Sequence, residues 1–138
     1  MAFSKFKNSK ILGVVTVVPR TVCCIDDEVE LYGGNEKQIA RIKRAVGLDK
    51  RHVTDQSTTT LDLCLDAAEK LIEGLGLDRE SINGVIFVTQ TPDHIQPSNA
   101  AIVHGKLQLS TNVVAFDISL GCSGYVYGLW MANMMVAS

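Results

Sequence analysis

The apolar positions along the chain fall into two patterns, continuous runs and helical stripes. Continuous runs rich in β-branched residues occupy residues 11–19 (ILGVVTVVP), 84–91 (GVIFVTQT) and 112–119 (NVVAFDIS). Uninterrupted runs of this length, bounded by proline, glycine or polar residues, are typical of strands that are buried on both faces. We therefore predict three buried strands.

Apolar residues at helical spacing predict helices between these strands. One helix lies in NEKQIARIKRAVG and would end at Gly47. The next would be capped by Ser57 or a neighbouring threonine and would end at Gly74 or Gly76. Its apolar stripe consists of Leu61, Leu65, Ala68, Ile72 and Leu75.

Two further helices complete the pattern. SNAAIVHGKLQL predicts a short helix capped by Ser98 or Asn99, and GYVYGLWMANMMVA predicts a final helix. LDKRHVTDQSTTT and PDHIQPS are polar and predict exposed connections. The alternation of helices with β-rich runs predicts an α/β fold with a mostly parallel sheet and helices on both faces.

The final helix is apolar on nearly all sides, so every side of it should be buried. The chain has 138 residues, about the size of one domain. A layered domain this small would struggle to cover such a helix completely. We therefore expect a second domain or a partner chain to cover the rest.

Composition excludes several classes of function. The formal net charge is −2 and no long charged block occurs, which argues against a role on nucleic acid or membrane surfaces. The basic start MAFSKFKNSK could pass for part of a signal peptide, but the apolar run after it is short and ends at Pro19. The four cysteines show no CxxC pair and no metal-ligand spacing, which favours free thiols in a reducing cytoplasm.

Cys122 stands in LGCSG, where the third predicted strand turns into the final helix. A helix N-terminus offers free backbone N–H groups and the positive end of the helix dipole, and both favour a thiolate. The same N–H groups can hold an oxyanion that forms when the sulfur attacks a carbonyl. The pattern alone equally fits a small apolar side chain at a tight junction. It therefore leaves both interpretations open.

Five segments together resemble the β-ketoacyl-acyl-carrier-protein synthase III family of thiolase-like condensing enzymes. They are KILGVVTVVP, GLDKRHV, STTTLDL, VIFVTQTPDHIQPSNAAIVHGKLQL and AFDISLGCSGYVYGL. The resemblance implies the first of the two repeats of the thiolase-like fold, spanning residues 1–138 without the second repeat. It favours the nucleophile at Cys122, which would accept an acyl group from acyl-coenzyme A.

The resemblance also implies the rest of the reaction. Malonyl-acyl-carrier protein would lose carbon dioxide and its carbanion would attack the acyl-cysteine, with no cofactor and no metal. The catalytic histidine and asparagine of the family come from the second repeat, so residues 1–138 alone should be inactive. His52, His94 and His104 are expected to have only local roles. A cytoplasmic homodimer is implied, without nucleic-acid or membrane partners.

Departures from the family pattern bear on substrate binding. Arg41 and Ala45 occupy the positions of a tryptophan and an arginine of the family's coenzyme A site. Arg44 is the candidate substitute, with Lys43 and Arg51 as alternatives. Gln96 replaces a bulky apolar residue in the loop that, in the family, reaches into the acyl pocket of the dimer partner.

Three other functions share part of this pattern. Hydroxymethylglutaryl-coenzyme A synthase and other thioester-condensing relatives share the cysteine. A non-catalytic thiolase-like subunit would typically lose that cysteine, which this sequence keeps. A complete small α/β binding domain is disfavoured by the apolar final helix.

Overall fold

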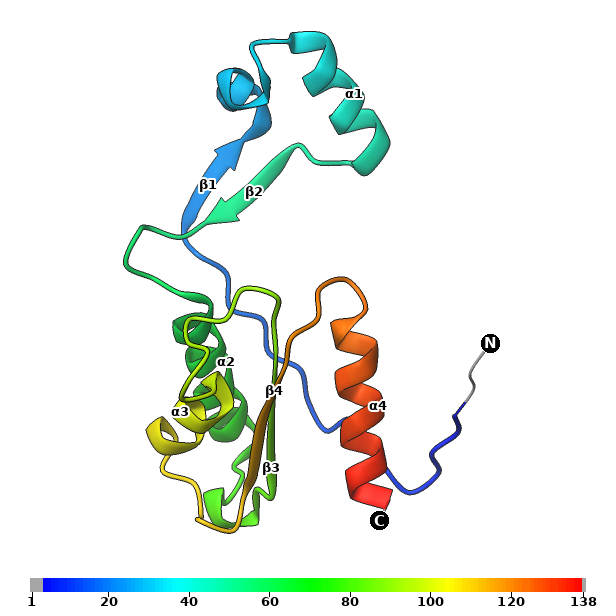
Figure 1. The fold of residues 1–138 in the computed structure, drawn as a ribbon, viewed down its shortest axis with the longest axis vertical. Coiled ribbons are helices and arrows are strands. Elements are labelled where there is room, and N and C mark those ends of the chain that lie inside the picture. Colours follow the sequence, from blue (N-terminus) through cyan, green and yellow to red (C-terminus); the bar gives the residue numbers. More distant parts are fainter. Residues whose placement is uncertain (1–3, 138) are drawn as a thin grey trace. The chain divides into compact units, whose positions relative to one another are not determined.

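The computed structural model describes residues 4–137, which form two compact units. Residues 18–58 make up the smaller unit, and the remaining residues make up the larger one. Figure 1 shows the helices and strands of both.

The smaller unit is built on an antiparallel hairpin of β1 (Thr21–Cys24) and β2 (Lys50–Val53). Between them lie the 3-10 helix η1 (Ile25–Tyr32) and α1 (Glu36–Val46). The side chain of Asn35 caps α1 at its start, and Gly47 ends it as predicted, with a φ of 72° that glycine adopts without strain. The hairpin was not predicted, because each strand has only 4 residues and β2 is polar; the prediction that the start of LDKRHVTDQSTTT is only a connection is therefore wrong for Lys50–Val53.

The larger unit contains the predicted βαβ arrangement. Strand β3 (Gly84–Val88), helix α3 (Asn99–Lys106) and strand β4 (Val114–Ile118) follow one another, and the two strands pair in parallel. The prediction of two strands in residues 84–91 and 112–119 is confirmed, although both strands are shorter than those runs. Figure 1 shows α3 and α4 (Gly124–Ala137) on opposite faces of this pair.

The core of the larger unit lies between the strand pair and the two helices on one face. Helix α2 (Thr60–Leu75) packs on α3, and the 3-10 helix η2 (Arg79–Ser81) follows it. Thr59 caps α2 in a capping box with Asp62, and Gly76 ends it, within the limits predicted from the sequence. The fully or nearly buried side chains of this core are Leu61, Ile72, Phe87, Ala100, Val103, Leu107 and Leu109.

The prediction of a buried strand at residues 11–19 is wrong for the described residues. This segment is extended but pairs with no strand among residues 4–137, and its backbone makes no hydrogen bond to another described backbone group. Alternate residues are exposed, including Leu12 and Val14, whereas Gly13 faces Leu71 and Leu75 of α2. The apolar run therefore has one covered face instead of two.

Helix α4 is exposed along one side. Gly124 and Gly128 are buried against β3, whereas six large apolar residues are open to solvent. They are Tyr125, Val126, Tyr127, Trp130, Met134 and Val136. The expectation that a second domain or a partner covers this side stays a prediction. No helix among the described residues combines the length and apolarity that crossing a bilayer requires.

Candidate functional site: the turn that carries Cys122

Cys122 lies in the turn between β4 and α4, two residues before the helix begins. The turn is closed by a hydrogen bond from the backbone N–H of Gly124 to the carbonyl oxygen of Gly121, at 2.8 Å. The N–H of Tyr127 then donates to the carbonyl of Ser123 at 3.1 Å, which starts the helix. The predicted placement of Cys122 just before a helix N-terminus is therefore confirmed.

The sulfur of Cys122 is open to solvent and free of protein partners in the part of the chain that the structure describes. Cys122 is exposed, and neither its Sγ nor its backbone N–H forms a hydrogen bond there. Within the described residues the side chain is therefore accessible to a substrate. The unused N–H at a helix N-terminus can donate to an oxyanion beside the sulfur.

Three glycines come close to β3 or to the segment that follows it. A Cβ on Gly124 would lie 2.7 Å from Cγ1 of Val88, and a Cβ on Gly128 would lie 2.9 Å from Cγ2 of the same side chain. A Cβ on Gly121 would overlap the side-chain amide of Gln90. Glycine at 124 and 128 lets α4 approach β3 more closely than any other residue would allow, whereas the flexible side chain of Gln90 could move away from a Cβ at 121.

The loop that carries Gln96 leaves the sheet at the same edge. Because β3 and β4 are parallel, the segments that follow them emerge side by side, and the N–H of Thr89 donates to the carbonyl of Ile118 at 3.2 Å. Gln96 is exposed in this loop, and its peptide bond to Pro97 is cis. Ligands of open α/β sheets bind outside this carboxyl edge, so the position suits a substrate site.

Arg44 lies on α1 in the smaller unit, and it is exposed without an ion pair among residues 4–137. Both alternatives to it are engaged. Arg51 forms a two-pronged ion pair with Glu28, at 2.5 and 2.7 Å. Lys43 donates to Asp26 at 2.6 Å and lies 2.7 Å from Asp49. Arg44 is thus freer than Lys43 or Arg51 to meet a phosphate.

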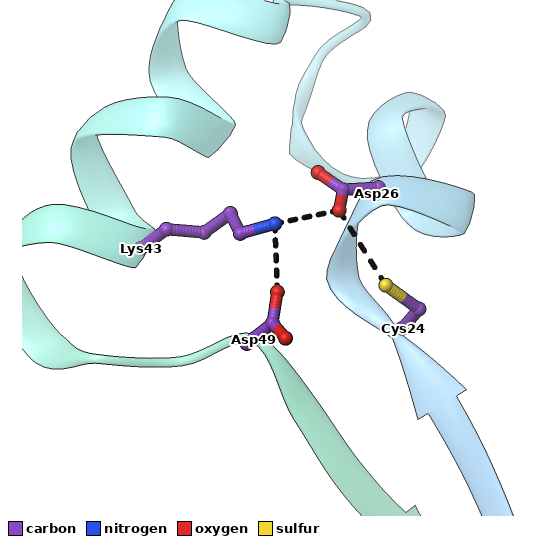
Figure 2. Close-up of polar contacts among 4 residues, drawn as sticks. All are labelled: Cys24, Asp26, Lys43 and Asp49. Atoms are coloured by element: carbon purple, nitrogen blue, oxygen red, sulfur yellow. Dashed lines mark hydrogen bonds and ion pairs between the residues drawn. The ribbon is translucent and has the colours of Figure 1, made fainter.

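The surroundings of Lys43 also bear on cation binding. Figure 2 shows its ammonium group between the two aspartates, with Sγ of Cys24 on the other side of Asp26 at 3.5 Å. The hydrogen bond to Asp26, followed by that to Asp49, raises the pKa of Lys43. Cys24, Asp26 and Asp49 offer ligand atoms within 4.8 Å of one another, but the ammonium already supplies positive charge there.

Two of the three histidines form local hydrogen bonds through their side chains, and the third does so through its backbone. His52 hydrogen-bonds through Nδ1 to the carbonyl of Pro19 at 2.6 Å, and His104 through Nε2 to the carbonyl of Ser110 at 2.8 Å. The backbone carbonyl of His94 accepts a hydrogen bond from Asn99 at 3.2 Å. Within residues 4–137, none of them is hydrogen-bonded to Cys122.

Sequence reasoning missed a polar pair beside this site, Asp117 and Asn99. Asp117 is a carboxylate within the apolar run of β4, and Asn99 is fully buried, at 0% exposure. They are joined by a hydrogen bond of 2.9 Å. The sequence did hold one signal for this pair. Asp117 is a charged residue inside a predicted buried strand, and a buried charge needs a hydrogen-bonding partner.

Comparison with known proteins shows which proteins the chain is similar to. No family model matches it. A protein of Campylobacter jejuni, provisionally named 3-oxoacyl-[acyl-carrier-protein] synthase 3, is 40% identical over 98% of this chain and 38% of its own length. The β-ketoacyl-[acyl-carrier-protein] synthase III of Rickettsia canadensis is 36% identical over 94% of this chain and 39% of its own length. The chain thus spans about two fifths of these relatives.

Solved structures agree with this relationship. The crystal structure of a 3-oxoacyl-(acyl-carrier protein) synthase from Burkholderia xenovorans superposes with a TM-score of 0.87, at 35% identity, over 95% of this chain and 37% of that one. The fold is that of the thiolase-like condensing enzymes. Within that class, the chain belongs to the β-ketoacyl-acyl-carrier-protein synthase III family and corresponds to its N-terminal part.

Proposed function

We propose that the chain carries the acyl-accepting nucleophile of an enzyme that makes β-ketoacyl thioesters, in fatty-acid biosynthesis or a related pathway. The thiolate of Cys122 attacks the carbonyl of an acyl-coenzyme A. The coenzyme A thiolate then leaves, and the acyl group stays on Sγ as a thioester. The observation that carries this proposal is the exposed, unpartnered sulfur beside an unused backbone N–H at the start of α4.

The second half of the reaction forms a carbon–carbon bond. Malonyl-acyl-carrier protein loses carbon dioxide, and the resulting carbanion attacks the thioester carbonyl on Cys122. The cysteine thiolate leaves, and a β-ketoacyl-acyl-carrier protein is released. We assign the decarboxylation groups, a histidine and an asparagine, to a second repeat outside residues 1–138. These residues form the N-terminal half-domain of the enzyme, and by themselves they would not catalyse condensation.

The remaining assignments concern substrates and assembly. Arg44 is proposed to contact a phosphate of coenzyme A, and its freedom from ion pairs supports this role. Gln96 is proposed to face the acyl group bound by the partner subunit of a cytoplasmic homodimer. Replacing Arg44 by alanine should raise the acyl-coenzyme A concentration needed for half-maximal labelling, without abolishing labelling.

Trapping of the acyl-enzyme tests the proposal. The protein, purified as its gene encodes it, is incubated with acetyl- and longer acyl-coenzyme A, and its peptides are analysed by mass spectrometry. We expect the acyl group on Cys122, its loss in Cys122→Ser, and its persistence in the matched control Cys64→Ser. Labelling that persists in Cys122→Ser would refute the assignment of the nucleophile.

A further inference from the structure

The carboxylate of Asp117 holds the start of α3. Its Oδ1 accepts a hydrogen bond from the backbone N–H of Ala100 at 2.7 Å, and its Oδ2 accepts one from the N–H of Asn99 at 2.8 Å. These are the first two N–H groups of the helix, which have no partner within it. Asp117 lies on β4, five positions before Cys122. The strand that leads to the sulfur is therefore bonded directly to the helix that follows the Gln96 loop.

Asn99 extends this connection into the loop itself. Its Nδ2 donates to Oδ2 of Asp117 at 2.9 Å and to the carbonyl of His94 at 3.2 Å. Its Oδ1 accepts a hydrogen bond from the N–H of Asp93, also at 3.2 Å. The side chain is fully buried, and the whole of its amide is used. A buried amide with all its bonds made has a single allowed orientation, so it fixes what it touches.

The far end of the loop is tied as well. Oδ1 of Asp93 accepts a hydrogen bond from the backbone N–H of Leu61, in the first turn of α2, at 3.3 Å. Between these ties, Ile95 and Gln96 project from the surface, and Ile95 is 89% exposed. Hydrogen bonds at both ends of the loop therefore hold Ile95 and Gln96 in a defined place, although these two residues are exposed.

We propose that Asp117 and Asn99 are positioning residues, which fix the loop of residues 93–97 on the body of the larger unit and so set which acyl groups are accepted by the site that this loop faces in the partner subunit. The inference rests on the proposed acylation of Cys122. Asp117 ties the loop to β4, because its carboxylate reaches the loop through Asn99. Neither residue is proposed to touch substrate.

A purely structural role predicts something different. If Asp117 and Asn99 only stabilised α3, then any loss of a cap at that helix would have the same effect. Ser98 provides the comparison, because its Oγ accepts a hydrogen bond from the N–H of Ala101 at 3.3 Å and caps the same helix without a bond to Asp117. Ser98→Ala is therefore the matched control for Asn99→Ala.

The first arm of the test follows the loop without any substrate. Hydrogen exchange at the backbone amide of Asp93, which donates to Oδ1 of Asn99, is compared among the wild-type protein, Asn99→Ala, Asp117→Asn and Ser98→Ala. In Asp117→Asn, one carboxylate oxygen becomes an NH₂ group that faces N–H donors, so at least one bond is lost. We expect faster exchange at this amide for the first two variants only. Equal exchange in Asn99→Ala and Ser98→Ala would overturn the proposal.

The second arm follows acylation of Cys122 by acetyl- and longer acyl-coenzyme A. We expect the ratio of the two rates to shift about tenfold in Asn99→Ala, since one or two methylene groups carry discrimination of about that size. Alkylation of Cys122 by iodoacetamide should change little. A ratio that stays at the wild-type value while the loop loosens would overturn the role in acyl selection.

Two further outcomes are separable. If the wild-type protein is not acylated at all, the proposed function fails, and the exchange arm still decides whether the pair positions the loop. If Asn99→Ala does not fold, Asn99→Ser replaces it. Serine keeps a donor for Asp117 but loses the bonds to Asp93 and His94, so a wild-type loop in that variant would refute the positioning role.

Discussion

The close packing of α4 on β3 leads to a sharp prediction about Gly128. Replacing Gly128 by alanine places a Cβ 2.9 Å from Cγ2 of Val88, a separation that real Cβ atoms essentially never show. Valine is stiff about χ1, so its methyl group cannot turn away easily. Helix α4 must therefore shift on the strand, and with it the turn that carries Cys122.

Two opposing terms set the size of the effect on stability. Alanine is a better helix former than glycine by about 1 kcal/mol in a helix interior. Overpacking of a well-filled contact costs about 1–3 kcal/mol. The free energy of unfolding should therefore fall by about 0–2 kcal/mol in Gly128→Ala. Gly74→Ala in α2 is the control, because a Cβ there meets nothing within 4 Å, and it should stabilise by about 0.5–1 kcal/mol.

Urea unfolding of the protein as its gene encodes it measures both variants. The difference between them isolates the packing term, about 1–3 kcal/mol. In a Val88→Ala background, the obstructing methyl groups are gone, so Gly128→Ala should become stabilising like Gly74→Ala. Equal effects of the two glycine substitutions in the wild-type background, or no change on removing the Val88 methyl groups, would refute this reasoning.

Three predictions concern ionisable groups. Hydrogen bonds from the side chains and backbone N–H groups of Ser57 and Thr58 lower the pKa of Asp55 to about 2. Asp55 therefore contributes stability above its unfolded pKa of about 4, and this contribution is lost as the pH falls toward 2. An NMR titration of Asp55 should show this midpoint, and Ser57→Ala should raise it. Burial, and then the charge of Asp93, raise the pKa of Cys64. The pH profile of Cys64 alkylation should therefore have its midpoint above that of an ordinary thiol. A midpoint at or below the ordinary value would contradict this. The hydrogen bond from Lys43 is the main cause that lowers the pKa of Asp26. Lys43→Met should therefore raise the pKa of Asp26 toward its ordinary value. An unchanged titration of the Asp26 carboxyl would show that another group lowers its pKa.

The sequence predicted the fold best where local signals and packing agree. The final helix was predicted at residues 124–137 and found there, Gly47 ends its helix as predicted, and the cap of α2 is a threonine close to Ser57, which the prediction allowed. The strand prediction for residues 11–19 was wrong because an apolar run indicates that a segment could be buried, but it does not show whether neighbouring strands are present to pair with it. The β1–β2 hairpin was missed for the opposite reason, because pairing between the two strands stabilises residues that lack a strong β pattern of their own.

The site was predicted in part for a similar reason. Cys122 could be placed because a strand, a small-residue turn and a helix follow one another along the chain. Asn99 could be predicted only as a helix cap, whereas in the structure Ser98 is the cap and Asn99 is buried inside the helix start. Its bonds to His94 and Asp117 depend on how the loop and β4 come together, which no local pattern encodes.

The extended segment at residues 11–17 has a practical consequence for handling these residues in isolation. Its apolar side chains Ile11, Leu12 and Val14 are exposed, and its backbone is unpaired among the described residues. Extended backbone with unpaired N–H and C=O groups beside exposed apolar side chains can pair with a strand of another chain. Residues 1–138 produced alone would therefore be prone to aggregate as their concentration rises, and co-expression with a polypeptide that pairs with this segment should keep them dispersed.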